Sequence, residues 1–178
     1  ISSAIPKREG YTFMGWADSA NAAAAVYRAN DPIQLHKNGN AEKTIYAVWK
    51  PGIYTVTLHA NGGAIASGKD ITSYTYGAGA TLPTENDITR EGYTFDGWYA
   101  DSSFSGAPVT AISSTDTGDK TFYAKWEANT YNVTVQNDGD GTGAATPAFG
   151  TMGGEITLTA MPNSGYRFKE WQIVSGSV

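Results

Sequence analysis

The chain has 178 residues, a formal net charge of −5 and no cysteine, so it can form neither a disulfide framework nor a thiolate metal site. Its 12 lysines and arginines are spread along the chain, with Lys7 and Arg8 as one adjacent pair, which argues against the clustered basic surface that a nucleic-acid partner requires. No apolar run approaches the roughly 20 residues that cross a bilayer, so we expect no membrane insertion.

A short aromatic motif recurs along the chain. Gly-Tyr-Thr-Phe-Met-Gly-Trp at 10–16 returns as Gly-Tyr-Thr-Phe-Asp-Gly-Trp at 92–98, and more loosely at 165–171. A second motif, Tyr-Ala-Val-Trp at 46–49, returns as Tyr-Ala-Lys-Trp at 123–126, and together the two motifs contain all five tryptophans. Each copy of a repeated module must fill its own small core, so we expect the tryptophans to be core residues.

The spacing of the motifs divides the chain into three repeats. Trp49 and Trp126 lie 77 residues apart. We expect a partial repeat at 1–50 (repeat one), a complete repeat at 53–127 (repeat two) and a partial, divergent repeat at 129–178 (repeat three). Both outer repeats are incomplete, so we interpret the chain as cut from a longer array. Linkers of only a few residues favour an extended rod.

Most of the chain predicts β-strands. Apolar and polar residues alternate with the period of two of a half-buried strand, the apolar positions being Ile45, Ala47 and Trp49; Tyr54, Val56 and Leu58; Phe122, Ala124 and Trp126; Tyr131, Val133 and Val135; and Ile156, Leu158 and Ala160. Asn-Gly-Gly at 61–63 and Asp-Gly at 138–139 predict hairpin turns. One helix candidate runs from Asp18 to Tyr27, where Asp18 or Ser19 could cap an alanine run.

The Phe-x-Gly-Trp spacing has a geometric consequence. In a regular strand Phe95 and Trp98 would face opposite sides of the sheet. Both can enter one core only if the strand bulges between them, which Gly97 permits. Gly15 has the same position in repeat one, whereas Glu170 replaces the glycine in repeat three.

These motifs resemble the Listeria–Bacteroides repeat, also called the internalin B-repeat family. The match covers Tyr54–Trp126 almost throughout and Ile5–Trp49 in part, and repeat three resembles a divergent branch of the family. The resemblance implies small β-grasp-like modules strung along bacterial surface or secreted proteins. It implies no enzymatic activity, no cofactor and no agreed ligand.

Candidate catalytic residues are few. The two histidines, His36 and His59, occupy non-equivalent places and lack the partners that nucleophilic catalysis needs. The carboxylate pairs Glu85 with Asp87 and Asp116 with Asp119 lie in turn-like segments and are better interpreted as solvated. We therefore expect no catalytic residue, no metal site and no cofactor site, and the ligand-binding residues are unknown.

Two further segments suggest binding. The segment 137–143, Asn-Asp-Gly-Asp-Gly-Thr-Gly, places oxygen ligands at alternate positions as a calcium loop does, but it lacks the glutamate of an EF-hand, and a turn is the preferred interpretation. Tyr74 and Tyr76 fall on one face of an expected strand and Tyr99 follows a core tryptophan. Exposed aromatic faces bind sugars in many modules, although packing is the simpler role for these rings.

We expect a non-enzymatic spacer and adhesion module at the bacterial cell surface or in a secreted protein. A host or neighbouring-cell surface protein is the first candidate partner. The alternative is a carbohydrate-binding accessory module of a secreted glycosidase, with carbohydrate as partner. The incomplete repeats at 1–50 and 129–178 lack strands, and bare sheet edges are templates for pairing. Strand pairing between chains or between repeats is therefore also expected.

Overall fold

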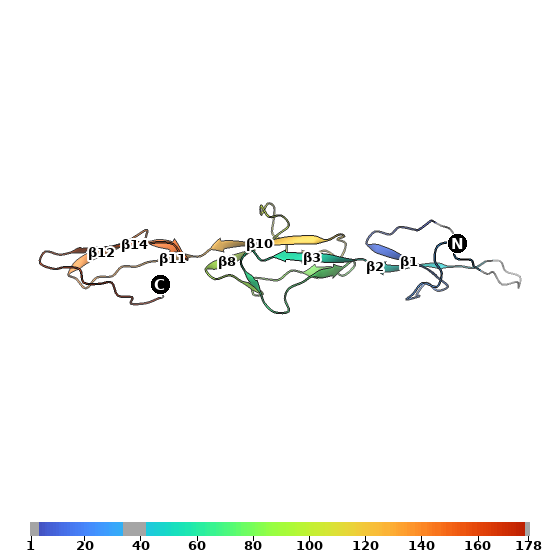
Figure 1. Ribbon diagram of the computed structural model, residues 1–178, viewed down its shortest axis with the longest axis horizontal. Helices are drawn as coiled ribbons and strands as arrows, with labels where there is room; N and C mark the ends of the chain where they lie inside the picture. The colour runs from blue at the N-terminus through green and yellow to red at the C-terminus, as the bar shows by residue number, and fades with distance from the viewer. Residues whose placement is uncertain (1–3, 34–41, 177–178) are drawn as a thin grey trace. The chain divides into compact units, whose positions relative to one another are not determined.

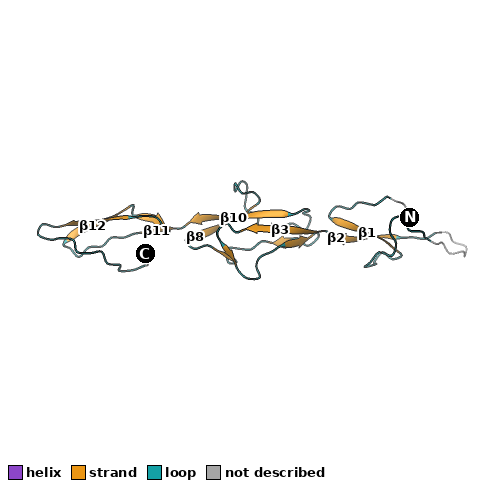
Figure 2. Ribbon diagram, viewed as in Figure 1, coloured by secondary structure: helices purple, strands orange, loops and turns teal. Residues whose placement is uncertain are grey.

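The computed structural model describes residues 4–33 and 42–176, and these residues form strands and turns without a helix (Figure 2). The expectation of a mainly β chain is confirmed. Contacts divide the chain into two compact units, Ile1–Thr89 with Phe95–Lys125 and Arg90–Thr94 with Trp126–Val178. The strands are β1 (Tyr11–Ala17), β2 (Tyr46–Pro51), β3 (Ile53–His59), β4 (Ala64–Ile65), β5 (Ser73–Thr75), β6 (Ala80–Thr81), β7 (Ile88–Thr89), β8 (Tyr93–Tyr99), β9 (Ala111–Ile112), β10 (Lys120–Ala128), β11 (Thr130–Asn132), β12 (Gly141–Thr146), β13 (Phe149–Thr151) and β14 (Thr157–Pro162).

Repeat two is built on a four-stranded sheet in the order β5-β3-β10-β8 (Figure 1). Its first and last strands, β3 and β10, run parallel at the centre, with Lys120 opposite Val56 and Tyr123 opposite His59. β5 pairs antiparallel with the first half of β3. A central parallel pair made by the first and last strands agrees with the expected β-grasp-like module. Short pairs, β4–β7 and β6–β9, occupy the connections in place of a helix.

The core of repeat two lies on one face of this sheet. Trp98 is 1% exposed, and its indole Nε1 donates a hydrogen bond to the carbonyl of Pro83 at 2.8 Å. Burying a large ring with its polar atom satisfied is strongly stabilising. The other buried apolar residues of this repeat are Val56, Tyr74, Leu82, Ile88, Tyr99, Ile112, Phe122 and Ala124. The alternation expected for β3 and β10 is thus confirmed at its central positions.

The predicted bulge is present. β1 pairs antiparallel with β2, and the register shifts between Phe13 and Gly15, which has a φ of +131°. The shift brings Phe13 and Trp16 together, with ring centroids 5.2 Å apart and edge to face. Gly97 has a φ of +136° in repeat two, where Phe95 and Trp98 make the same contact at 5.6 Å.

The helix expected at Asp18–Tyr27 does not form. Tyr27 pairs with Trp16 instead: the amide of Tyr27 donates to the carbonyl of Trp16 at 2.9 Å, and the amide of Trp16 donates back at 2.8 Å. The Asp18 carboxylate accepts from the Tyr27 hydroxyl at 3.0 Å rather than capping a helix. Strand-like pairing at the end of the alanine run thus overrides its helix propensity.

The turn at 61–63 forms, but it does not connect a hairpin. Asn61 and Gly62 have φ values of 50° and 87°, and the Gly63 amide donates to the carbonyl of Ala60 at 3.0 Å. The strand that follows, β4, pairs with β7 and not with β3. In repeat three β12 likewise pairs with β14, and β11 pairs with β13. The prediction of a turn at 61–63 is confirmed, whereas the prediction that its flanking strands form a hairpin is wrong. The strands after the turn pair with strands further along the chain.

Repeat three has no such core. Trp171 is 41% exposed, and Phe168, whose ring lies 4.9 Å from it, is 45% exposed. No strand is assigned to 163–174. The expectation that every tryptophan is a core residue is therefore wrong for Trp171. In repeat two, the strand that carries Trp98, β8, is paired with β10, whereas the described residues around Trp171 have no strand assignment.

Candidate functional site

The turn that opens the aromatic motif of repeat one contacts the start of repeat two, within the first compact unit. The Tyr11 amide donates to the carbonyl of Arg8 at 3.1 Å and closes the turn. The carbonyl of Gly10 accepts from the amide of Gly52 at 2.8 Å, and the carbonyl of Gly52 accepts from the amide of Tyr76 at 2.9 Å. We call this hydrogen-bonded cluster a junction.

Side chains close the junction as tightly as its backbone does. A β-carbon at Gly10 would lie 2.3 Å from the ring of Tyr76. The rings of Tyr11 and Tyr76 meet edge to face at 5.2 Å, and the Arg8 guanidinium lies 3.9 Å from the centre of the Tyr11 ring. Gly10 also has a φ of +73°. Only glycine combines this backbone conformation with so close an approach.

A second junction lies within the second compact unit and shares a backbone bond and an arginine–tyrosine contact with the first, with Met152 in place of Tyr76. The amide of Asn129 donates to the carbonyl of Gly92 at 2.9 Å. Gly92 has a φ of +75°, and a β-carbon there would lie 2.5 Å from the sulfur of Met152. The Arg90 guanidinium lies 3.7 Å from the centre of the Tyr93 ring. One structural motif therefore occurs at the start of repeat two and again at the start of repeat three.

A third copy of the turn is open. The Tyr166 amide donates to the carbonyl of Asn163 at 3.0 Å, as in the other two turns. Gly165 has a φ of +85°, yet nothing lies within 4 Å of the position of its β-carbon. The turn conformation therefore forms without a neighbour, and the junction contacts are added to a preformed turn.

An acid–lysine–tyrosine cluster connects β8 and β10 of repeat two. The Asp96 carboxylate accepts from Lys125 Nζ at 2.6 Å and from the Tyr99 hydroxyl at 3.0 Å. The hydrogen bond from Lys125, with that from Tyr99, lowers the pKa of Asp96, and the same bond raises the pKa of Lys125. A similar cluster in repeat one consists of Asp18, Lys43 and Tyr27.

The structure describes one of the two histidines. His36 lies outside the described residues. The ring of His59 is exposed and stacks on Tyr123, with centroids 4.7 Å apart and planes inclined by 8°. The stack joins His59 of β3 to its pairing partner in β10.

Asp87 stabilises a turn. Its carboxylate accepts from the amide and hydroxyl of Thr84 at 2.9 and 2.7 Å and pairs with Lys69 Nζ at 3.0 Å. The bonds from the Thr84 amide and hydroxyl, followed by the Lys69 contact, lower the pKa of Asp87 to about 2. Glu85, which the sequence placed beside it, is exposed.

The second carboxylate pair also bonds to backbone amides. Asp119 accepts from the amide of Thr55 at 2.7 Å, which connects the start of β10 to β3. Asp116 accepts from the amide of Ser113 at 3.2 Å within its own turn. Each carboxylate therefore has a backbone amide as its partner.

The calcium-like segment 137–143 uses its oxygens internally. The side chain of Asn137 accepts from the amide of Gly139 at 3.1 Å, and that of Asp138 accepts from the amide of Asp140 at 3.0 Å. These are Asx-type turn bonds. Over residues 4–33 and 42–176, no group of three His, Cys, Asp or Glu residues is arranged to hold a metal ion.

The tyrosines that suggested sugar binding are largely covered. Tyr74 is 3% exposed and its hydroxyl donates to the carbonyl of Gly118 at 2.7 Å. Tyr99 is also buried, and Tyr76 packs on Gly10 in the first junction. The three rings therefore form no exposed platform.

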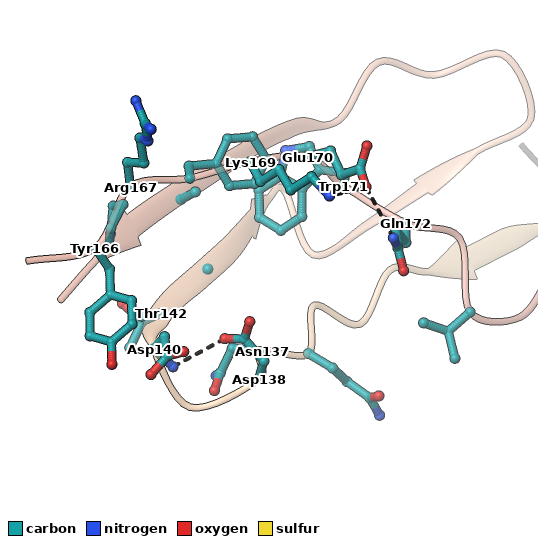
Figure 3. A pocket seen from close by; sticks show the side chains of 17 residues that line it. Asn137, Asp138, Asp140, Thr142, Tyr166, Arg167, Lys169, Glu170, Trp171 and Gln172 are labelled. Atoms are coloured by element: carbon teal, nitrogen blue, oxygen red, sulfur yellow. Dashed lines mark hydrogen bonds and ion pairs between the residues drawn. The ribbon is translucent and has the colours of Figure 1, made fainter.

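Repeat three contains an open cavity of about 530 Å³. One side is formed by the turn at 136–143 and the other by residues 166–172, including Tyr166, Phe168 and Trp171 (Figure 3). Figure 3 shows Tyr166 and Trp171 from the second segment facing the side of the turn that carries Asn137 and Asp140. These aromatic rings are exposed, although the sequence predicts Trp171 among them to be a core residue.

The junctions were also missed at the level of sequence. Their signal was present, since Arg8-Glu9-Gly10-Tyr11 returns as Arg90-Glu91-Gly92-Tyr93. An invariant glycine at the start of a strand indicates a positive φ or a close backbone approach. What the sequence did not reveal is that the approaching group belongs to the next repeat.

Comparison with known families decides the assignment. The family model of the Listeria-Bacteroides repeat domain matches residues 1–48 and 54–125. The chain belongs to the Listeria–Bacteroides repeat family. Residues 131–178 match the family model of the divergent InlB B-repeat domain. Both matches fall on the repeats identified by their aromatic motifs, and both describe repeat domains rather than catalytic ones.

Two of the relatives are named as membrane proteins, and a third is named as an internalin. The chain is 30% identical over 165 residues to a putative Gly-rich membrane protein of Evansella cellulosilytica, covering 92% of this chain and 18% of the relative. It is 31% identical over 167 residues to a putative membrane protein of the same organism, covering 93% and 23%, and 30% identical over 146 residues to internalin H of Listeria monocytogenes, covering 77% and 24%. The chain thus spans less than a quarter of each relative's length. No solved structure matches it significantly.

The described residues include no long apolar helix of the kind that spans a membrane.

Proposed function

We propose that this chain is a non-enzymatic spacer of a bacterial cell-surface or secreted protein, holding a distal domain away from the cell wall. The recurrence of one junction at Gly10 and at Gly92 carries the proposal. A joint built from the residues of a repeating motif can be used any number of times along an array, which is what a spacer of adjustable length requires.

The proposal extends to protein contacts. Its relatives include internalin H and two membrane proteins, so an extracellular position at the cell surface agrees with their names. A host or neighbouring-cell surface protein is the partner class that we propose. Aromatic groups exposed in repeat three, Tyr166 and Trp171, provide the kind of side chain that is enriched at protein interfaces.

The alternative, a carbohydrate-binding accessory module of a secreted glycosidase, has less support. It was based on Tyr74, Tyr76 and Tyr99, of which two are buried and the third is covered by a junction. A glycan-binding measurement distinguishes the two functions. Binding to a polysaccharide that is lost on replacing exposed Trp171, and retained on replacing buried Trp98 conservatively with Phe, would favour the alternative.

The spacer function is tested with tandem arrays of residues 53–127 containing one, two, three and four copies. Small-angle X-ray scattering measures the maximum dimension of each array. A spacer predicts a constant increment for every added copy. A dimension that grows only as the cube root of mass, as for a globule, contradicts the proposal.

Junction variants refine the same experiment. Gly92→Ala places a β-carbon against Met152, and Gly153→Ala is its matched control, because Gly153 has a φ of +74° but nothing within 4 Å. Both changes carry the same backbone strain. Only Gly92→Ala should alter the scattering curve of the chain.

A further inference from the structure

Met152 fills, in the second junction, the place that Tyr76 fills in the first. Met152 follows β13 directly, as Tyr76 follows β5. β13 and β5 in turn pair with β11 and β3, the opening strands of their repeats. Each of the two side chains packs on the glycine that opens an aromatic motif. At this position the first junction therefore has an aromatic ring, and the second has a thioether.

The sulfur of Met152 makes the closest approach to Gly92. A β-carbon at Gly92 would lie 2.5 Å from Sδ of Met152, 2.8 Å from its Cβ and 3.2 Å from its Cγ. Met152 is nevertheless 52% exposed, so small solutes reach its side chain. A thioether is readily oxidised when it is exposed. The atom that packs on the junction glycine is therefore one that a small oxidant can modify.

The other two methionines of the chain lie outside the junctions. Met14 belongs to β1 and Met161 to β14, and they are 48% and 61% exposed. All three thioethers are thus open to the same oxidant. Of the three, Met152 is the one whose sulfur lies against a junction glycine. Oxidation can therefore affect a junction through this residue, and the other two serve as internal comparisons.

We propose that Met152 is an oxidation site that loosens the second junction, and that the first junction, which is closed by Tyr76, resists the same oxidant. The oxidant class is a peroxide, and hydrogen peroxide is its simplest member. A lone pair of the sulfur forms a bond to one peroxide oxygen while the oxygen–oxygen bond breaks, and the second oxygen leaves as water. The sulfur loses two electrons and the peroxide gains two. Reduction of the sulfoxide to the thioether reverses the change.

The added oxygen alters the contact through space and polarity. The gap between the sulfur and Gly92 is already too small for a β-carbon, so it has no room for an oxygen. A sulfoxide is also polar, and it favours water over packing against backbone. Both effects draw the side chain away and open the bond from the Asn129 amide to the Gly92 carbonyl to water. The turn itself persists, because Gly165 has a similar φ without a neighbour.

Hydrogen exchange of the whole chain, before and after treatment with dilute hydrogen peroxide, tests the proposal. Nuclear magnetic resonance follows individual amides, and mass spectrometry of peptides measures the sulfoxide content at each methionine. We expect the Asn129 amide to exchange at least about fivefold faster in the oxidised chain, because exchange reports local opening. The Gly52 amide, which donates to the carbonyl of Gly10 at 2.8 Å in the first junction, should exchange at an unchanged rate.

Two variants separate Met152 from general oxidation, each compared with its own untreated form. Met152→Leu keeps an apolar side chain of similar volume without the sulfur, and it should abolish the response of the Asn129 amide. Met161→Leu is the matched control and should respond like the unmodified chain. The proposal is overturned if peroxide oxidises Met161 and spares Met152, if oxidation of Met152 leaves the exchange of Asn129 unchanged, or if the two variants respond equally.

Discussion

The ring of Tyr76 occupies the space that a side chain at Gly10 would need, since a β-carbon there would lie 2.3 Å from the ring. The two residues belong to different repeats. The glycine that opens the aromatic motif therefore serves the neighbouring repeat, while the phenylalanine and tryptophan that follow it serve their own core. One short motif encodes both a core and a connection.

Gly10→Ala should destabilise the first compact unit more than Gly68→Ala does. Gly68 has a φ of +77°, close to the +73° of Gly10, but nothing lies within 4 Å of its β-carbon position. Both variants carry the strain of a left-handed backbone, about 1–2 kcal/mol. Gly10→Ala adds about 1–3 kcal/mol of overpacking against Tyr76. Urea unfolding measures both, and equal losses would show that the junction contact adds nothing to stability.

Trp98→Ala should reduce the free energy of unfolding by about 3–5 kcal/mol, because a large ring is removed from a core that cannot collapse to fill the space. Trp171→Ala should cost about 1 kcal/mol or less, since the ring is 41% exposed. Chemical denaturation followed by tyrosine fluorescence and circular dichroism compares them. Similar losses for the two variants would contradict the difference in packing between repeats two and three.

Gly97→Ala should strongly destabilise repeat two through the bulge. The residue has a φ of +136°, and a β-carbon would lie 2.6 Å from Cβ of Pro108. Gly106→Ala is a control for positive φ in open space, with a φ of +82°. We expect the Gly97 variant to lose the contact between Phe95 and Trp98, seen as a change in the near-ultraviolet circular dichroism that Gly106→Ala does not produce.

Ionisation of Asp87 should make the free energy of unfolding depend on pH in the acidic range. Its pKa in the folded chain is lowered to about 2 by the Thr84 bonds and the Lys69 contact, from an ordinary value of 3.8. A lowered folded pKa contributes stability that is present above the ordinary value and is lost as the pH falls toward 2. Asp87→Asn should therefore be less stable than the unmodified chain at neutral pH, and the difference should shrink between about pH 4 and pH 2. Thermal unfolding across this range tests the prediction, with Glu85→Gln as control. A difference that stays constant with pH would show that ionisation of Asp87 is not the cause.

Sequence reasoning predicted what local chemistry dictates. Alternating residues identified β3 and β10, and the Phe-x-Gly-Trp spacing predicted the bulge at Gly15, because a three-residue separation is incompatible with one face of a regular strand. The helix candidate at Asp18–Tyr27 failed because the two-way pairing of Tyr27 with Trp16 is a tertiary contact that no propensity reports.

The candidate site was harder to predict, because its contacts join residues that are far apart in the sequence. The turn at Asn61–Gly63 was predicted, but the pairing of β4 with β7 could not be predicted. The residues of the turn do not specify which strand pairs with the strand that follows the turn. Trp171 has the sequence context of a core residue, yet its side chain is 41% exposed. At the first junction, the sequence indicates that Gly10 has a special conformation, but it does not indicate that Tyr76 packs against it.

The parallel pairing of β3 with β10 has a mechanical consequence. The polypeptide enters repeat two through β3 and leaves it through β10, and since the two strands run in the same direction, they are pulled in opposite directions when the chain is stretched. Tension then loads the hydrogen bonds between Val56–His59 and Lys120–Tyr123 together, in shear, instead of opening them one at a time. A module whose ends are connected in this way resists traction.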